Sequence, residues 1–501
     1  MRKYLFCLFA LIIFAPSQAQ TGMMQGIIRD AETQEVLPFA NILVWGVNKG
    51  TISNVEGRYI LNIEDLKNSD TLEFRYVGYE TLRLSIQDVL DKPAIALKPS
   101  AVELQGVEVL AEDLTVEQIL ERVRDRYETN YPPLKDRRKI FFHSYDKAPF
   151  DPSNQLILKK SDFVGLNDEI FEDVFGKIPE NFIEYQDAIV ELFHGPDSYK
   201  MIPIDGVSLE ESSMKDLAGE LEQRLGVFFD DIQNTMTEED IYYKFRTGIF
   251  SQKVGHKGEI DTTLQMNRND PTHYTIKTRY VKGELLYLIK NYSHFESKNW
   301  QFLNSPKKYN YILGDLTVYG DELVYEISFK PRSKGLFEGR MFISTRDYAV
   351  LQMDYAFASG KVTERFQLLG LGHSMNFKQG RVIFEKSVSG YYPKYISAMQ
   401  NESASIDRKF SVMKKKKRFL FDKELNEIKL EAHLKFNVDS SWEMLVLDQK
   451  EIGDKDFANV IQPENMKFRK EYAYSPEMWN SMTVIAPSSE LQKYKRNASV
   501  D

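Results

Sequence analysis

The residues with the clearest potential for chemistry are two histidines and one glutamate. His256 and Glu259 form an H-x-x-E pair, and His373 follows more than a hundred residues later. Histidine and carboxylate side chains in such a set can bind zinc. In a chain with 7 histidines and many acidic residues, chance alone is enough to produce one H-x-x-E pair. No catalytic carboxylate or shaped pocket can be identified around it, so we predict no metal site, no catalytic residues and no cofactor.

Other motifs for enzymatic chemistry are missing from the sequence or are non-specific. The sequence has no G-x-S-x-G, no Walker-type glycine loop and no H-E-x-x-H, so hydrolase and nucleotide chemistry have no sequence support. Paired acids occur at Asp230-Asp231 and at Glu238-Glu239-Asp240. Such acidic pairs usually lie on solvated faces or at helix starts, and we interpret them in this way.

Two further segments could bind a partner. Lys414 to Arg418 are consecutive basic residues beside Phe419, Leu420 and Phe421, which would suit anionic lipid or an acidic partner. We interpret this run as a basic hairpin tip next to an ordinary strand. Tyr391, Tyr392 and Tyr395 could stack on a sugar, but aromatic residues in this pattern also fit the core of a sheet, which we favour.

The elements that must carry these residues begin with short strands between Met23 and Ala111. About seven β-like runs alternate with closely spaced turn signals, a pattern that predicts a small antiparallel β-sandwich. Asn54 to Gly57 should form a turn, and Gly50 and Gly78 lie where positive φ or close backbone approach is needed. In "LEFRYVGYETLRL" the alternation of Leu72, Phe74 and Tyr76 with Glu73 and Arg75 predicts one buried and one wet face.

This segment resembles the carboxypeptidase-regulatory-like domain, a transthyretin-like β-sandwich similar to the accessory domain of metallocarboxypeptidases. The matching motifs, which cover about a fifth of the chain, are Gly26-Ile27-Ile28-Arg29-Asp30, Leu37-Pro38-Phe39-Ala40-Asn41-Ile42, Gly50-Thr51, Ser53-Asn54, Gly57-Arg58-Tyr59 and Tyr76-Val77-Gly78-Tyr79. The resemblance implies an exported Bacteroidetes-type envelope protein. It gives no support to zinc chemistry, since in those enzymes the sandwich follows the catalytic domain, whereas here it precedes the H-x-x-E pair.

The remainder divides into a connector and a sheet. Residues 113–240 are expected to be a mixed α/β connector that begins with a helix. Thr115 is the expected N-cap of this helix, with Gln118 three residues later, and the helix should end before Pro132. Residues 241–501 alternate as an antiparallel, curved sheet, with hairpins around Gly320-Asp321 and around 345–347. This part resembles an uncharacterised family of exported envelope proteins and, in style, lipoprotein-carrier half-barrels. We therefore predict a mainly β fold: a seven-stranded sandwich over 20–112, a helical connector and a large antiparallel sheet.

The N-terminus and the charge indicate the compartment. Residues 1–19 have two basic residues, an apolar run and a small-residue end, which predicts a cleaved signal peptide and no transmembrane span after cleavage. Cys7, the only cysteine, lies in this segment, so the mature chain has neither disulfides nor a thiol nucleophile. Loss of Arg2 and Lys3 takes the formal charge from −9 to −11. An acidic exported chain is a poor candidate for nucleic-acid binding.

Together these observations predict a non-enzymatic binding or structural protein of the cell envelope, periplasmic or associated with the outer membrane. Its ligand would be protein, glycan or lipid. Two alternatives remain open: an envelope hydrolase of metallocarboxypeptidase type, and an accessory subunit of an outer-membrane uptake machine with an outer-membrane protein as partner.

Overall fold

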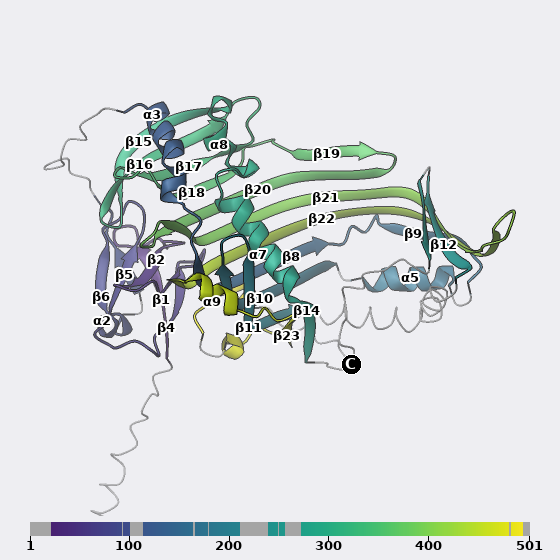
Figure 1. Cartoon of the computed structure of the whole chain (residues 1–501), viewed down its shortest axis with the longest axis horizontal. Helices are drawn as coiled ribbons and strands as arrows, with labels where there is room; N and C mark the ends of the chain where they lie inside the picture. The colour runs from purple at the N-terminus through teal and green to yellow at the C-terminus, as the bar shows by residue number, and fades with distance from the viewer. Residues whose placement is uncertain are drawn as a thin grey trace, which may run out of the picture.

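The structure is a computed structural model in which an N-terminal sandwich lies against one end of a large curved sheet (Figure 1). It describes residues 22–92, 94–100, 114–163, 166–178, 180–210, 239–248, 250–255, 272–479 and 482–493. The predicted signal peptide and the pair His256 and Glu259 lie outside these residues. Strands dominate the described parts, so the mainly β prediction is confirmed.

The N-terminal sandwich (residues 22–100) has seven strands in two sheets. The sheet β4-β1-β7 faces the sheet β3-β2-β5-β6, and a short helix α2 follows β6. The bounds are Met23–Asp30 (β1), Asn41–Val44 (β2), Gly50–Ile52 (β3), Arg58–Asn62 (β4), Thr71–Arg75 (β5), Leu82–Ser85 (β6), Ile86–Leu90 (α2) and Ala94–Leu97 (β7). Its core of aliphatic and aromatic residues, including Ile42, Leu72 and Phe74, is separate from that of the large sheet.

The turn residues behave as the sequence predicts. Asn54 Oδ1 accepts hydrogen bonds from the amides of Glu56 and Arg58, and Gly57 has a φ of +73°. A Cβ on Gly50 would lie 2.3 Å from the carbonyl oxygen of Ile42, so this strand pair tolerates only glycine there. The local geometry therefore explains these residues without any catalytic role.

Within the described residues the large sheet contains sixteen strands, and its main path runs β14-β23-β11-β10-β8-β22-β21-β20-β18-β17-β16-β15. Strands β9, β12, β13 and β19 pair outside this path. The bounds are Asp136–Pro149 (β8), Gln155–Ser161 (β9), Asn181–His194 (β10), Tyr199–Glu210 (β11), Ile241–Thr247 (β12), Phe250–Gly255 (β13), His273–Lys277 (β14), Tyr309–Tyr319 (β15), Glu322–Pro331 (β16), Phe337–Ser344 (β17), Val350–Phe357 (β18), Thr363–Leu368 (β19), Leu371–Lys386 (β20), Tyr391–Lys416 (β21), Lys423–Glu451 (β22) and Asn465–Glu471 (β23). Strands β20, β21 and β22 are the longest and extend as an arm away from the sandwich (Figure 1).

Most helices lie near the sandwich or along the large sheet, whereas α5 lies beside β9 on the arm (Figure 1). Their bounds are Val116–Asp125 (α3), Tyr127–Asn130 (α4), Asp168–Lys177 (α5), Thr278–Ser293 (α7), Gln301–Asn304 (α8), Asp454–Asn459 (α9) and Ser489–Gln492 (α10), with 3-10 turns at Lys298–Trp300 (η1), Pro306–Lys308 (η2) and Pro476–Trp479 (η3). Helix α7 crosses the sheet (Figure 1) and buries Val281, Leu285 and Leu288 in its core. No helix in the described residues is long and apolar enough to cross a membrane.

Several details differ from expectation. Two strand pairs are parallel, β1 with β7 and β11 with β23. Strand β7 lies at the edge of its sheet, whereas β23 lies between β11 and β14. Four strands within 113–240, β8 to β11, belong to the large sheet instead of forming a separate unit. Residues 241–501, expected to be sheet, also contain α7 and α8.

The supposedly wet face of β5 is covered. Glu73 is fully buried, where it pairs with Arg75 and Arg83. These two arginines reach Glu385 and Asp321 of the large sheet. The prediction of a solvent-exposed face is therefore wrong at Glu73, because a strand pattern does not show what packs on its polar side.

The helix predicted after the sandwich is confirmed as α3. Thr115 Oγ1 accepts a hydrogen bond from the Gln118 amide, and the Gln118 side chain accepts one from the Thr115 amide. This capping box satisfies two amides that the first helical turn leaves unpaired. The helix buries Ile119, Leu120 and Val123 against the core.

Removal of this cap gives a modest, specific prediction. We expect Thr115→Ala to lower the free energy of unfolding by about 1 kcal/mol, measured by chemical denaturation, because the Gln118 amide loses its acceptor. Thr115→Asn supplies an equivalent oxygen and should keep nearly the wild-type stability. Equal losses in both variants would show that the cap is unimportant.

Candidate functional site

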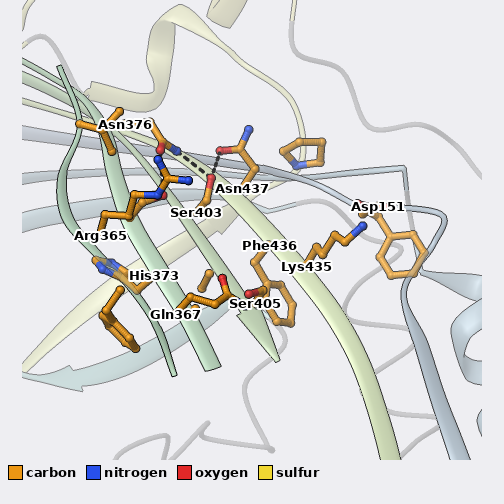
Figure 2. Close-up of a pocket in the computed structure, with 17 residues that line it drawn as sticks. Asp151, Arg365, Gln367, His373, Asn376, Ser403, Ser405, Lys435, Phe436 and Asn437 are labelled. Atoms are coloured by element: carbon orange, nitrogen blue, oxygen red, sulfur yellow. Dashed lines mark hydrogen bonds between the residues drawn. The ribbon is translucent and has the colours of Figure 1, made fainter. Parts of the chain in front are cut away.

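A cleft in the described parts of the chain lies on the extended arm. This cleft has a volume of about 850 Å³ and is lined by β19, β20, β21, β22 and the turn after β8 (Figure 2). Its lining residues are Pro149, Phe150, Asp151, Val362, Arg365, Phe366, Gln367, Gly372, His373, Ser374, Asn376, Ser403, Ala404, Ser405, Lys435, Phe436 and Asn437. We consider it the candidate binding site.

Strand register explains why polar side chains meet in the cleft. Ser374 of β20 lies opposite Ser403 of β21, which in turn lies opposite Asn437 of β22. Two residues further along, Ser405 lies opposite both Gly372 and Lys435. Residues directly opposite one another, and those two apart, share one face of a sheet. The three strands thus present rows of hydroxyl and amide groups.

These groups form a connected hydrogen-bond network. Asn376 Nδ2 donates to Ser403 Oγ at 2.7 Å and to Asn401 Oδ1 at 2.9 Å, and Asn401 Nδ2 donates to Asn437 Oδ1 at 2.8 Å. Figure 2 shows Ser403 between Asn376 and Asn437. The side chains are held in place by one another yet remain partly exposed. A network held in this way is preorganised for a polar ligand.

One glycine keeps the floor of the cleft open. A Cβ on Gly372 would lie 2.4 Å from Ser405 Oγ and 2.8 Å from Gln367 Oε1. Any larger residue would push these two polar groups aside. Gly372 therefore leaves Ser405 and Gln367 accessible to a ligand.

Charged and aromatic groups surround the polar rows. Arg365 and Lys435 are exposed beside the network, Asp151 is the single carboxylate among the lining residues, and Phe150 adds an aromatic ring. The arrangement offers many hydrogen-bond donors and acceptors and one carboxylate, whereas glycoside hydrolysis commonly uses a pair of carboxylates.

His373 lines both the cleft and a second, smaller hollow of about 220 Å³. Its Nε2 is 3.2 Å from Glu402 Oε2, and this hydrogen bond raises the pKa of the imidazole. Among the described residues, no three His, Cys, Asp or Glu side chains come close enough to share a metal ion. Because His256 and Glu259 lie outside the described residues, the absence of a zinc site stays a prediction.

The other residues singled out in the sequence have structural places. Tyr391, Tyr392 and Tyr395 are buried, which confirms the core interpretation. The basic run is confirmed as the end of the β21–β22 hairpin, with Lys416 paired to Asp240. Asp230, Asp231 and Glu238 lie outside the described residues.

The cleft residues were missed in the sequence, although a signal exists. "HSMNF", "NESASID" and "KFNVDSS" place small polar residues at alternate positions of three strands. One of these strands alone reads as an ordinary half-exposed strand. Only the register of β20, β21 and β22 shows that the polar positions face one another.

A largely buried pair of a histidine and an aspartate was also missed in the sequence. His143 of β8 and Asp187 of β10 lie opposite each other and form an ion pair. Burial lowers the pKa of His143, but the charge and hydrogen bond of Asp187 outweigh it, so the pKa is raised. The pair links two neighbouring strands of the large sheet and lines neither the cleft nor the smaller hollow beside His373.

A third hollow, of about 210 Å³, lies where the sandwich meets the large sheet. Arg75 lines it together with Glu385, Asp347 and Lys386. These charges form ion pairs with one another: Arg75 pairs with Glu385, and Lys386 pairs with Asp347. We interpret this hollow as part of the packing between the two units.

Comparison with known proteins identifies the N-terminal part. Residues 24–109 match the family model of the CarboxypepD_reg-like domain. The TonB-dependent receptor P3 of Formosa agariphila is 33% identical over 84 residues, which are 17% of this chain and 8% of the receptor. The chain thus spans less than a tenth of the length of that receptor.

Two solved structures align over a larger share of the chain. MucB in complex with MucA(peri) covers 68% of this chain and 100% of its own at 7% identity and a TM-score of 0.17. The Pseudomonas aeruginosa MucA/MucB complex covers 67% of this chain and 99% of its own at 7% identity and a TM-score of 0.18. Scores this low establish no common fold. The sandwich is the part whose family is shown: residues 24–109 of this chain are a CarboxypepD_reg-like domain.

Proposed function

We propose that the protein is a non-enzymatic binding protein of the cell envelope and that its cleft holds a saccharide chain. The observation that carries this proposal is the set of facing hydroxyl and amide groups on β20, β21 and β22, with Ser374, Ser403 and Asn437 in one row. Hydroxyl and amide groups both donate and accept hydrogen bonds, which matches the hydroxyl groups of a sugar. A cleft of about 850 Å³ has room for several sugar rings.

Binding agrees with the chemistry of the lining better than hydrolysis does. Glycoside hydrolysis usually takes two carboxylates across the scissile bond, and Asp151 is the single carboxylate lining the cleft. Arg365 and Lys435 add positive charge at its edge, so saccharides that carry carboxylates should bind more tightly than neutral ones.

The compartment is part of the same proposal. The CarboxypepD_reg-like domain and its similarity to part of a TonB-dependent receptor support a place in the envelope. We propose that the chain is exported through its N-terminal signal and works in the periplasm or at the outer membrane, where an outer-membrane protein could be its partner. Recovery of the protein in the cytosolic fraction of its native cells would contradict this.

Isothermal titration tests the site. Wild-type protein would be titrated with maltohexaose, cellohexaose and hexagalacturonate, and at least one is expected to bind. The double variant Ser403→Ala/Asn437→Ala removes a hydroxyl and an amide from the row formed with Ser374. We expect its affinity to fall about tenfold or more, because each lost hydrogen bond contributes about 1 kcal/mol.

A matched control removes the same chemical groups elsewhere. Ser333 and Asn459 are exposed residues that do not line the cleft, so Ser333→Ala/Asn459→Ala should bind like the wild type. If none of the three saccharides binds, or if both double variants lose affinity equally, the proposed site is wrong.

A further inference from the structure

The end of the β21–β22 hairpin exposes three consecutive large apolar side chains. Phe419, Leu420 and Phe421 are 101%, 78% and 86% exposed. They belong to the turn over residues 417–422, which we call the tip, at the far end of the arm from the sandwich (Figure 1). Exposed apolar side chains that gather at one place commonly mark an interaction site.

The tip is flanked by positive charge. Between Lys414 and Glu424 the chain has six basic residues and two acidic ones. Lys415 pairs with Glu424 and Lys416 with Asp240, while Lys417 Nζ donates to the carbonyl of Glu239. The strand ends thus retain excess positive charge directly behind the apolar side chains, although the whole chain is acidic.

The size and shape of the tip distinguish between partners. A stable protein interface buries about 800 Å² on each partner, whereas two phenylalanines and one leucine offer less than that, since one phenylalanine buries about 150 to 250 Å². Apolar side chains at the end of a projection, followed by basic residues, instead match a bilayer, in which the apolar groups enter the acyl boundary and the basic groups meet anionic headgroups.

We propose that the tip docks onto an anionic lipid surface, with Phe419, Leu420 and Phe421 inserted and the basic run among the headgroups. Strand β21 has 26 residues, so the tip can stand up to about 85 Å from the sandwich along the strand. Ser403 in the cleft precedes Lys416 by roughly 40 Å of strand. Docking by the tip would hold the cleft and the sandwich above the bilayer. This inference does not depend on what the cleft binds.

Vesicle co-sedimentation tests the proposal with protein purified after export. Wild-type protein is expected to bind vesicles of phosphatidylglycerol and phosphatidylcholine, and to bind phosphatidylcholine alone at least tenfold more weakly. The triple variant Phe419→Ser/Leu420→Ser/Phe421→Ser should lower binding to the anionic vesicles at least tenfold. The variant Lys417→Gln/Arg418→Gln should weaken it about fivefold per charge removed.

Val388 and Ile461 provide a matched control, since both are highly exposed apolar residues away from the tip. Val388→Ser/Ile461→Ser should bind vesicles like the wild type. Circular dichroism would show that the variants keep the wild-type fold, as expected for changes at a solvent-exposed turn.

Three results would overturn the proposal. The first is wild-type protein that does not bind anionic vesicles, and the second is a triple variant that binds as well as the wild type. The third is a concentration-dependent dimer, found by light scattering without vesicle binding and lost in the triple variant, because it would assign the tip to a second copy of this chain. Failure of saccharide binding in the cleft would leave the vesicle result unaffected, so the two proposals are tested separately.

Discussion

Replacement of Trp300 by alanine is expected to lower the free energy of unfolding by about 4 kcal/mol, because it leaves a large cavity in the core. Trp300 ends the 3-10 turn η1 after α7 and is 0% exposed. Its ring meets Tyr127 and Phe384 edge to face, and its Nε1 donates to the carbonyl of Tyr292. One side chain therefore joins α4, α7 and β20, and its loss should loosen all three.

The measurement is chemical denaturation monitored by circular dichroism, with two comparison variants. Trp300→Phe keeps most of the volume and should lose less than Trp300→Ala. Trp45→Ala serves as the control: this tryptophan is 54% exposed and meets Arg83 in a cation–π contact, so its loss should be about 1 kcal/mol or less. If Trp300→Ala lowers the free energy of unfolding no more than Trp45→Ala does, the role of Trp300 in joining α4, α7 and β20 is contradicted.

Lys394 gives the second large effect, which depends on pH. It lies at an irregularity where β21 pairs with β20, and its side chain is 1% exposed. Its Nζ donates to the carbonyl of Val446. Burial lowers the pKa of Lys394 to about 8, although the charges of Glu385 and Asp448 partly oppose this. The charged form is therefore destabilised in the folded protein.

The sign follows from the two pKa values. In the unfolded chain the lysine pKa is about 10.4. Below pH ~8 both states are protonated, and the full penalty of a buried charge is present. Between pH ~8 and ~10.4 the folded state releases its proton while the unfolded state keeps it, so stability rises with pH there by up to about 3 kcal/mol.

Lys394→Met removes this contribution while it keeps a similar volume. The difference in unfolding free energy between variant and wild type should shift by about 2 to 3 kcal/mol in favour of the wild type from pH 7 to pH 10. Groups that titrate equally in both proteins, the buried tyrosines among them, cancel in this difference. Chemical denaturation at several pH values measures it. A difference that stays constant over this range would show that Lys394 has an ordinary pKa when folded.

The sandwich was the most predictable part of the fold, because its determinants are local. Gly57 with positive φ, the turn at Asn54 and the alternation through Phe74 each specify a strand end or a face from a few neighbouring residues. The capping box at Thr115 is local in the same way. Such features can be recognised without any knowledge of what packs nearby.

Features that depend on distant contacts could not be predicted in the same way. Glu73 is buried because Arg75 and Arg83 bridge it to the large sheet, which lies hundreds of residues away in sequence. Helix α7 carries apolar residues at helical spacing, such as Val281, Leu285 and Leu288, but it lies between strands that dominate the pattern. Strands β8 and β9 pair with β22, and β10 and β11 follow β8 in the same sheet, an arrangement that no local signal specifies.

The cleft shows the same limit at the level of function. Ser374, Ser403 and Asn437 are far apart in sequence, and each looks like an ordinary polar residue of a strand. Their alignment depends on a register that extends across three long strands. The basic and apolar residues of the tip, in contrast, are consecutive, so the sequence alone indicated their possible partners.

Hydrogen–deuterium exchange tests the central claim most directly. The protein would be compared free and saturated with whichever of the three saccharides binds most tightly. The account predicts slower exchange over residues 365–376, 403–405 and 435–437, which line the cleft, and unchanged exchange in the sandwich. Unchanged exchange in these segments, or protection confined to the sandwich, would contradict the assignment of the cleft as the binding site.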